Sequence, residues 1–140
     1  MVLIRKKEGI EHIDANIMIR LITVDDPDMA KRAKKLVSKK NKVYILEDAV
    51  MMEIVFVLTG DYYGFTRQEA AESIKVALAI ENIYCNKGLI EDALNIYVDH
   101  PKLSFVDCYL AAITNITDER PLWTFDKKLL SQCPLAKEPR

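Results

Sequence analysis

The chain has 140 residues, half of them apolar and 29% charged, with a formal net charge of −1. This composition is typical of one globular domain with a buried core, and it excludes a disordered or fibrous protein. No apolar stretch approaches the roughly 20 residues that span a bilayer, and the N-terminus reverses the order of a secretory signal by placing apolar residues ahead of charges. We therefore expect a cytoplasmic protein outside the membrane.

Strand patterns alternate with helical patterns along the chain. Because short strands are separated by helices, we expect an α/β fold with a parallel sheet that helices cover on both faces. The predicted elements are strand 9–14, helix 15–23, helix 25–40, strand 42–46, helix 47–60, helix 66–80, strand 82–85, helix 88–100, helix 104–116, strand 121–125 and a short helix from Lys127.

Capping signals predict where several of these helices begin. Asp26 is expected to cap the second helix, and Thr66 with Glu69 forms a capping-box pattern. Ser104 with Asp107 forms a second such pattern. In the helix over 88–100, one face is expected to be buried, formed by Ile90, Ala93, Leu94 and Tyr97.

The second helix carries a strongly basic stretch. Residues 31–42 contain seven Lys or Arg and no acid. A solvated helix face and a phosphate-contacting patch both produce this pattern. The residues expected on the opposite, buried face are Met29, Ala33, Leu36 and Val37.

The cysteine and histidine residues do not form a recognisable metal-binding or disulfide pattern in the sequence. Cys85, Cys108 and Cys133 are odd in number and far apart. We expect buried, reduced thiols rather than a disulfide framework or a zinc site. His12 and His100 are isolated in the sequence.

Four acidic residues suggest a metal site. Asp14 and Asp126 each follow a predicted strand, and the carboxyl ends of parallel strands share one edge of a sheet. Glu53 lies in the apolar run "MMEIVFVL", where a buried carboxylate would need a partner or a metal. Each acid alone, including Asp107, is also explained as a helix cap or an exposed residue. Convergence at one edge explains all four, and Mg²⁺ or Mn²⁺ would offset their repulsion.

Four stretches of the sequence, which contain these acids, together resemble PIN-domain nucleases, and most closely VapC-type toxins of toxin–antitoxin pairs. The matching stretches are "HIDANIMIRLITVDDPDMAKRA", "EDAVMMEIVFVL", "LSFVDCYLAA" and "LWTFDKKL". They follow the family's order and separations and cover about residues 10–131. The resemblance implies a single PIN domain over residues 1–140, with a PIN-like three-layer α/β/α fold around a short central parallel sheet.

The resemblance also implies roles for individual residues. The acidic quartet that would bind Mg²⁺ or Mn²⁺ is Asp14, Glu53, Asp107 and Asp126. Asn16 would help to hold Asp14, and Thr124 matches the hydroxyl residue two positions before the final acid. The candidate RNA-binding residues are Arg20, Lys34, Lys35 and Lys39.

The implied activity is hydrolysis of RNA phosphodiester bonds that leaves a 5′-phosphate and a 3′-hydroxyl. Candidate substrates are tRNA and rRNA. The implied partners are a cognate antitoxin protein and a second copy of the chain. For the antitoxin we expect an apolar groove, because apolar helix residues such as Ile54, Phe56 and Tyr62 exceed what a small core needs.

The sequence departs from the family pattern at its two ends. About nine residues precede the first strand, which suggests a different start or a partner-facing extension. The chain ends soon after Leu135, so the usual final strand is expected to be short or absent.

Other functions stay open. One is a non-catalytic PIN-fold module that binds RNA or protein. Another is a haloacid-dehalogenase phosphatase, which would need Asp-x-Asp where this chain has Asp14-Ala15-Asn16. A third is a phosphoreceiver, which would need paired acids after the first strand and a late lysine after a strand; Lys127 beside Asp126 does not fit that arrangement.

Overall fold

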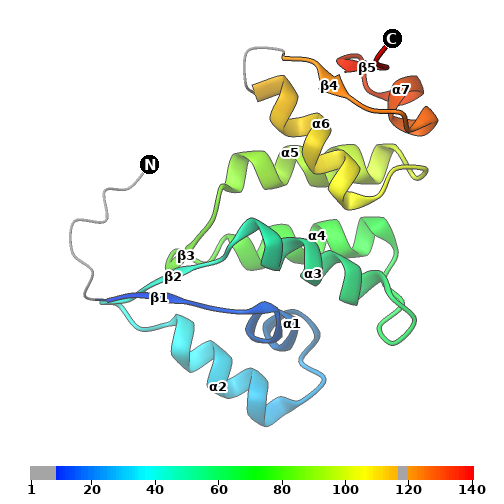
Figure 1. Ribbon diagram of the computed structural model, residues 1–140. Coiled ribbons are helices and arrows are strands. Elements are labelled where there is room, and N and C mark those ends of the chain that lie inside the picture. Colours follow the sequence, from blue (N-terminus) through cyan, green and yellow to red (C-terminus); the bar gives the residue numbers. More distant parts are fainter. Residues whose placement is uncertain (1–8, 117–119) are drawn as a thin grey trace. The chain divides into compact units, whose positions relative to one another are not determined.

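The computed structural model describes residues 9–116 and 120–140, which form seven helices and two small parallel sheets (Figure 1). The chain divides into two compact units, Met1–Cys85 and Asn86–Arg140. The predicted α/β class is confirmed, whereas the PIN-like layout and the single PIN domain stay predictions. None of the described helices has the length and apolar character to cross a bilayer. Most of the segment ahead of the first strand lies outside the described residues.

The first unit is built on a three-stranded parallel sheet in the order β1-β2-β3. Its strands are β1 (Ile10–His12), β2 (Val43–Ile45) and β3 (Ile83–Tyr84). Tyr44, in the middle of the central strand, is fully buried, and its hydroxyl donates to the Leu36 carbonyl at 2.7 Å. That hydrogen bond ties the sheet to the helix that precedes β2.

Four helices complete this unit, and α1 packs against the other three (Figure 1). They are α1 (Ala15–Thr23), α2 (Pro27–Val37), α3 (Asp48–Thr59) and α4 (Arg67–Leu78). The predicted caps are confirmed: Asp26 accepts the Met29 N–H at 3.0 Å, and Thr66 with Glu69 closes a capping box. Local chemistry therefore fixes the N-termini of α2 and α4.

The buried face of α2 differs from the prediction at Met29, and Leu36 is only half-buried. Ala33 and Val37 are buried as expected, but Met29 is 41% exposed and Ala30 takes its place. Ala30, Ala33 and Val37 follow the 3-4 spacing of a helix stripe, and Met29 lies one residue outside it. The assignment of Met29 to the core was therefore wrong.

A left-handed turn joins α1 to α2. Val24 has φ 51° and ψ 29°, and its N–H donates to the Arg20 carbonyl at 3.1 Å. β-branched residues rarely adopt this conformation because the side chain crowds the backbone. The turn brings the start of α2 back beside α1.

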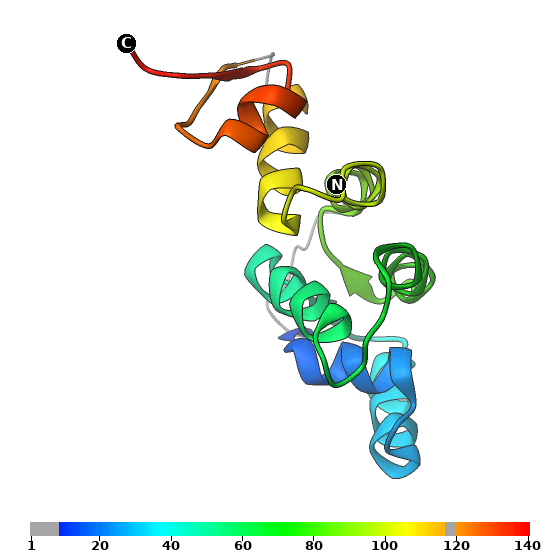
Figure 2. The same cartoon turned by 90° about the vertical axis from the view of Figure 1, so that its right-hand side faces the viewer.

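The second unit pairs two long helices with a small sheet. Its elements are α5 (Lys87–Asp99), α6 (Phe105–Ile116), β4 (Leu122–Trp123), α7 (Lys127–Gln132) and β5 (Ala136–Lys137). Figure 2 looks nearly along α5 and shows α6 running across it. The rings of Tyr97 and Phe105 meet edge to face at 5.6 Å between these helices. The predicted buried face of α5 is confirmed at all four of its positions.

The described strands pair within each of the two units. β4 pairs in parallel with β5, whereas β1 pairs with β2. The final strand is therefore present and short. The strands that precede Asp14 and Asp126 belong to different units, so the expectation that the two acids share one sheet edge stays a prediction.

The predicted burial of the cysteines is confirmed for Cys108 and Cys133, whereas Cys85 is only half-buried. Buried thiols of this kind pack as small apolar side chains. His100 directly follows α5, and its ring Nδ1 lies 3.1 Å from the Ile96 carbonyl of that helix.

Candidate functional site

Asp14 lies directly beyond β1 and caps α1. Its Oδ1 accepts the backbone N–H groups of Asn16 at 3.0 Å and of Ile17 at 3.4 Å. The contact predicted for Asn16 is thus made by its main chain. Oδ2 accepts no hydrogen bond from the described residues, and the carboxylate is exposed. One oxygen of Asp14 is held while the other is free to bind a ligand.

A second carboxylate occupies the same edge of this sheet. Glu47 is the N-cap residue of α3 and follows β2, and the two strands are in register with His12 opposite Ile45. His12 Nδ1 lies 3.4 Å from Glu47 Oε1, so this histidine is not isolated. The prediction missed Glu47, although an acid directly after strand 42–46 is the same signal that identified Asp14.

Glu53 is exposed, contrary to the expectation that its apolar neighbours would bury it. The buried residues of α3 are Met51, Ile54, Val55 and Leu58. Glu53 lies on the opposite face, three positions from Phe56, which is 78% exposed. The run looked apolar all round because this exposed phenylalanine shares the solvent face with the acid. Burial therefore gives no reason for a metal at Glu53.

Asp107 closes the capping box predicted at the start of α6. Its Oδ2 accepts the Ser104 N–H at 3.2 Å, and its own N–H donates to Ser104 Oγ at 3.1 Å. The side chain is half-buried. Oδ1 accepts no hydrogen bond from the described part of the chain.

Asp126 caps α7 in the same way. Its Oδ1 accepts the Lys128 N–H at 2.8 Å, and its own backbone N–H donates to Thr124 Oγ1 at 2.9 Å. The hydroxyl predicted to support this aspartate therefore holds its main chain in place. Oδ2 receives no hydrogen bond from described residues, and the carboxylate is exposed.

The quartet is divided between the two units. Asp14 and Glu53 belong to Met1–Cys85, and Asp107 and Asp126 belong to Asn86–Arg140. Among the described residues, neither unit by itself gathers three or more Asp, Glu, His or Cys side chains into a metal-binding group. The quartet as a whole stays a prediction.

Arg20 is held in a polar network between two turns. Its Nη1 lies 2.8 and 2.9 Å from the two carboxylate oxygens of Asp25, which also accepts the hydroxyls of Tyr63 at 2.7 Å and Thr23 at 2.9 Å. The hydrogen bonds from Tyr63 and Arg20 hold the pKa of Asp25 well below its usual range, and the bond to Asp25 raises the pKa of Arg20. The Arg20 Nε–H is thus a buried donor without an acceptor among the described residues.

The basic stretch of α2 faces outward. Lys34, Lys35 and Lys39 are all exposed, as a phosphate patch and a solvated face both require. Two other residues of the stretch make ion pairs: Lys42 Nζ lies 3.1 Å from a Glu11 carboxylate oxygen, and Arg32 Nε lies 3.1 Å from Asp28 Oδ2. The three exposed lysines stay RNA-binding candidates.

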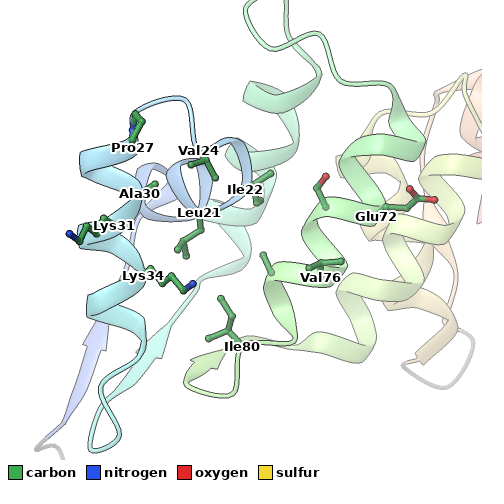
Figure 3. Close-up of a pocket in the computed structure, with 12 residues that line it drawn as sticks. Leu21, Ile22, Val24, Pro27, Ala30, Lys31, Lys34, Glu72, Val76 and Ile80 are labelled. Carbon is green, nitrogen blue, oxygen red and sulfur yellow. The ribbon is translucent and has the colours of Figure 1, made fainter.

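An apolar groove of about 790 Å³ lies between α1, α2 and α4 (Figure 3). Its apolar walls include Leu21, Ile22, Val24, Ala30, Val76 and Ile80. Lys31 and Lys34 stand along its α2 side, and Glu72 stands on α4 (Figure 3). The groove was expected from an apolar surplus, but different residues line it: Ile54 is fully buried, and Phe56 and Tyr62 are exposed elsewhere.

A scan against protein-family models finds no match to this chain. Searches of curated proteins and of solved structures find no match either.

Proposed function

We propose that the protein is a metal-dependent endoribonuclease of the PIN-domain type that acts in the cytoplasm as the toxin of a toxin–antitoxin pair. One observation carries the proposal. At Asp14, Asp107 and Asp126, a capping bond fixes one carboxylate oxygen and leaves the other without a hydrogen bond from described residues. Outer-shell hydrogen bonds orient metal-binding carboxylates in the same manner. Helix cap and metal ligand are therefore compatible roles for one aspartate.

The residues of the quartet fit a hard divalent cation. Their carboxylate oxygens are the ligands that Mg²⁺ and Mn²⁺ prefer. When bound, the ion would supply a more acidic water and would stabilise negative charge on the phosphate. The chain's own contribution is orientation: Thr124 holds the backbone of Asp126, and the helix N–H groups hold Asp14 in place.

Contacts to the RNA backbone would come from the exposed lysines of α2 and the turn after it, Lys34, Lys35 and Lys39. Contacts of this kind position a substrate without specifying its sequence. Candidate substrates remain tRNA and rRNA. The proposal also includes a homodimer, because the family that the chain resembles usually forms one.

The proposal is tested with the wild-type protein. We expect it to cleave structured RNA with Mg²⁺ or Mn²⁺, to leave 5′-phosphate ends, and to lose this activity when EDTA removes the metal. End-labelled tRNA and rRNA resolved on a sequencing gel would show the cuts. Equal cleavage in EDTA would reject metal dependence. Binding of RNA without any metal-dependent cut, by protein that calorimetry shows to bind Mn²⁺, would favour the non-catalytic binding module.

The groove between α1, α2 and α4 supports an antitoxin as partner. Its walls are apolar, and Val76 and Val24 remain 75% and 54% exposed. Exposed apolar patches next to charged rims mark protein-binding surfaces. Lys31 and Lys34 at the rim would pair with acidic residues of an amphipathic helix whose apolar side chains fill the groove.

Val76→Asp should therefore abolish co-purification with the antitoxin. The charge would be buried on binding, which is costly without a partner, whereas it is solvated in the free protein. Phe56→Asp is the matched control, because Phe56 is equally exposed but does not line the groove. Both variants would be co-expressed with a candidate antitoxin, sought as a small protein encoded by a neighbouring gene. Retention of the partner by Val76→Asp, or its loss from the control alone, would contradict the assignment.

A further inference from the structure

A second cavity, of about 470 Å³, lies between α1 and α2. Its lining residues come from both helices: Asn16, Ile17, Arg20, Met29, Arg32 and Leu36. The cavity begins beside the candidate metal ligand, because the Asn16 N–H donates to Asp14 Oδ1 at 3.0 Å. Its volume lies within the range of about 300–1,000 Å³ that small-molecule sites occupy.

One part of the lining suits a flat apolar group. Ile17 and Leu36 are half-buried, and Met29 is 41% exposed at the cavity although it lies on an otherwise amphipathic helix. Methionine adapts its shape to ring systems and is favoured at binding surfaces. A nucleobase, which has a flat apolar face and polar edges, matches this surface.

The other part of the lining suits a phosphate. Asp25 already binds three side chains, yet Arg20 keeps a buried Nε donor without an acceptor among the described residues. A buried donor without an acceptor is destabilising until one arrives. Arg32 adds a second guanidinium, tied to Asp28 by a surface pair of the kind that contributes little and exchanges readily. Guanidinium groups bind phosphate oxygens with two parallel hydrogen bonds.

We propose that this cavity binds one unpaired nucleotide of RNA, with the base against Ile17, Met29 and Leu36 and the phosphate on Arg20 and Arg32. The inference rests on the proposed ribonuclease function, and it adds a subsite for the RNA: one nucleotide whose base has left its stack would occupy this cavity. Recognition of unstacked bases is how proteins usually read RNA. The cavity would place that nucleotide next to Asp14.

The test uses the full chain in EDTA, so that binding is read without cleavage. Fluorescence anisotropy would measure affinity for a labelled single-stranded oligoribonucleotide, the same strand with one abasic position, and its duplex. We expect the intact strand to bind about 10-fold more tightly than the abasic strand, in line with the contribution of one stacked base. The duplex should bind no better than the abasic strand.

Two variants isolate the cavity. Arg32→Lys keeps the charge but loses the planar fork, and it should weaken binding of the intact strand about 10-fold. Met29→Gln should remove the difference between intact and abasic strands. Lys31→Gln is the matched control: it removes a charge next to Arg32 on the groove side of the same helix, and it should weaken binding less than about 3-fold.

The outcomes separate this inference from the proposed function. Base-dependent binding that both variants reduce, in a protein without metal-dependent cleavage, would support the cavity and reject the nuclease. Metal-dependent cleavage together with equal affinity for intact and abasic strands would overturn the cavity and leave the nuclease standing. Wild-type binding by folded Arg32→Lys and Met29→Gln proteins would also overturn it.

Discussion

Asp126→Asn should abolish Mn²⁺-dependent cleavage while α7 and the thermal midpoint stay unchanged. Asparagine caps helices as well as aspartate does, so its side-chain oxygen can still accept the Lys128 N–H that Asp126 accepts at 2.8 Å. The formal charge that would bind the metal is lost. We expect activity to fall by at least about 100-fold, similar to the loss of one transition-state contact, and Mn²⁺ affinity to fall with it.

Asp26→Asn supplies the control. Asp26 caps α2 through the Met29 N–H at 3.0 Å, so it has the same local role as Asp126 without belonging to the quartet. Asp14→Asn should behave like Asp126→Asn, and Asp26→Asn like the wild type. Cleavage kinetics, calorimetry with Mn²⁺ and the thermal midpoint in EDTA would distinguish them. Wild-type cleavage and metal affinity in a folded Asp126→Asn protein would return Asp126 to the role of helix cap alone.

Ile54→Ala should destabilise the first unit by about 2–5 kcal/mol, whereas Phe56→Ala should change stability by less than about 0.5 kcal/mol. Ile54 is completely buried in α3, so truncation removes apolar contacts and leaves a cavity. Phe56, two residues later, is 78% exposed and loses little. Urea unfolding followed by far-UV circular dichroism would measure both. Equal destabilisation by the two changes would mean that α3 buries the opposite face.

Local signals predicted much of this structure correctly. Capping boxes identify two helix starts, because each needs only two residues three positions apart. They are Ser104 with Asp107 and Thr66 with Glu69. The buried face of α5 was equally readable, since its apolar residues follow the helical repeat without interruption.

What failed depends on contacts that spacing does not encode. The exposure of Glu53 was hidden because exposed Phe56 makes the helix look apolar on both faces. The pairing of β4 with β5 involves strands of two residues each, too short to carry a register pattern. The bond between Arg20 and Asp25 joins residues five apart across a left-handed turn, a separation that no helix face predicts.

The carboxylates show how a local pattern can support two interpretations. In the sequence, helix cap and metal ligand are alternative predictions for Asp14 and Asp126. The structure assigns the cap to one oxygen of each and leaves the second oxygen without a hydrogen bond from described residues. Atom-level geometry was needed to see that the two roles do not compete.

The left-handed conformation of Val24 links the stability of the α1–α2 turn to the apolar groove beside it. Glycine would adopt φ 51° without strain, and a non-glycine residue in this region costs on the order of 1–3 kcal/mol. Valine nevertheless occupies the position, and its side chain forms part of the wall of the apolar groove. A protein optimised for stability alone would carry glycine here and lose that wall. The strained turn is therefore a place where a thermostabilising substitution would remove part of the groove wall.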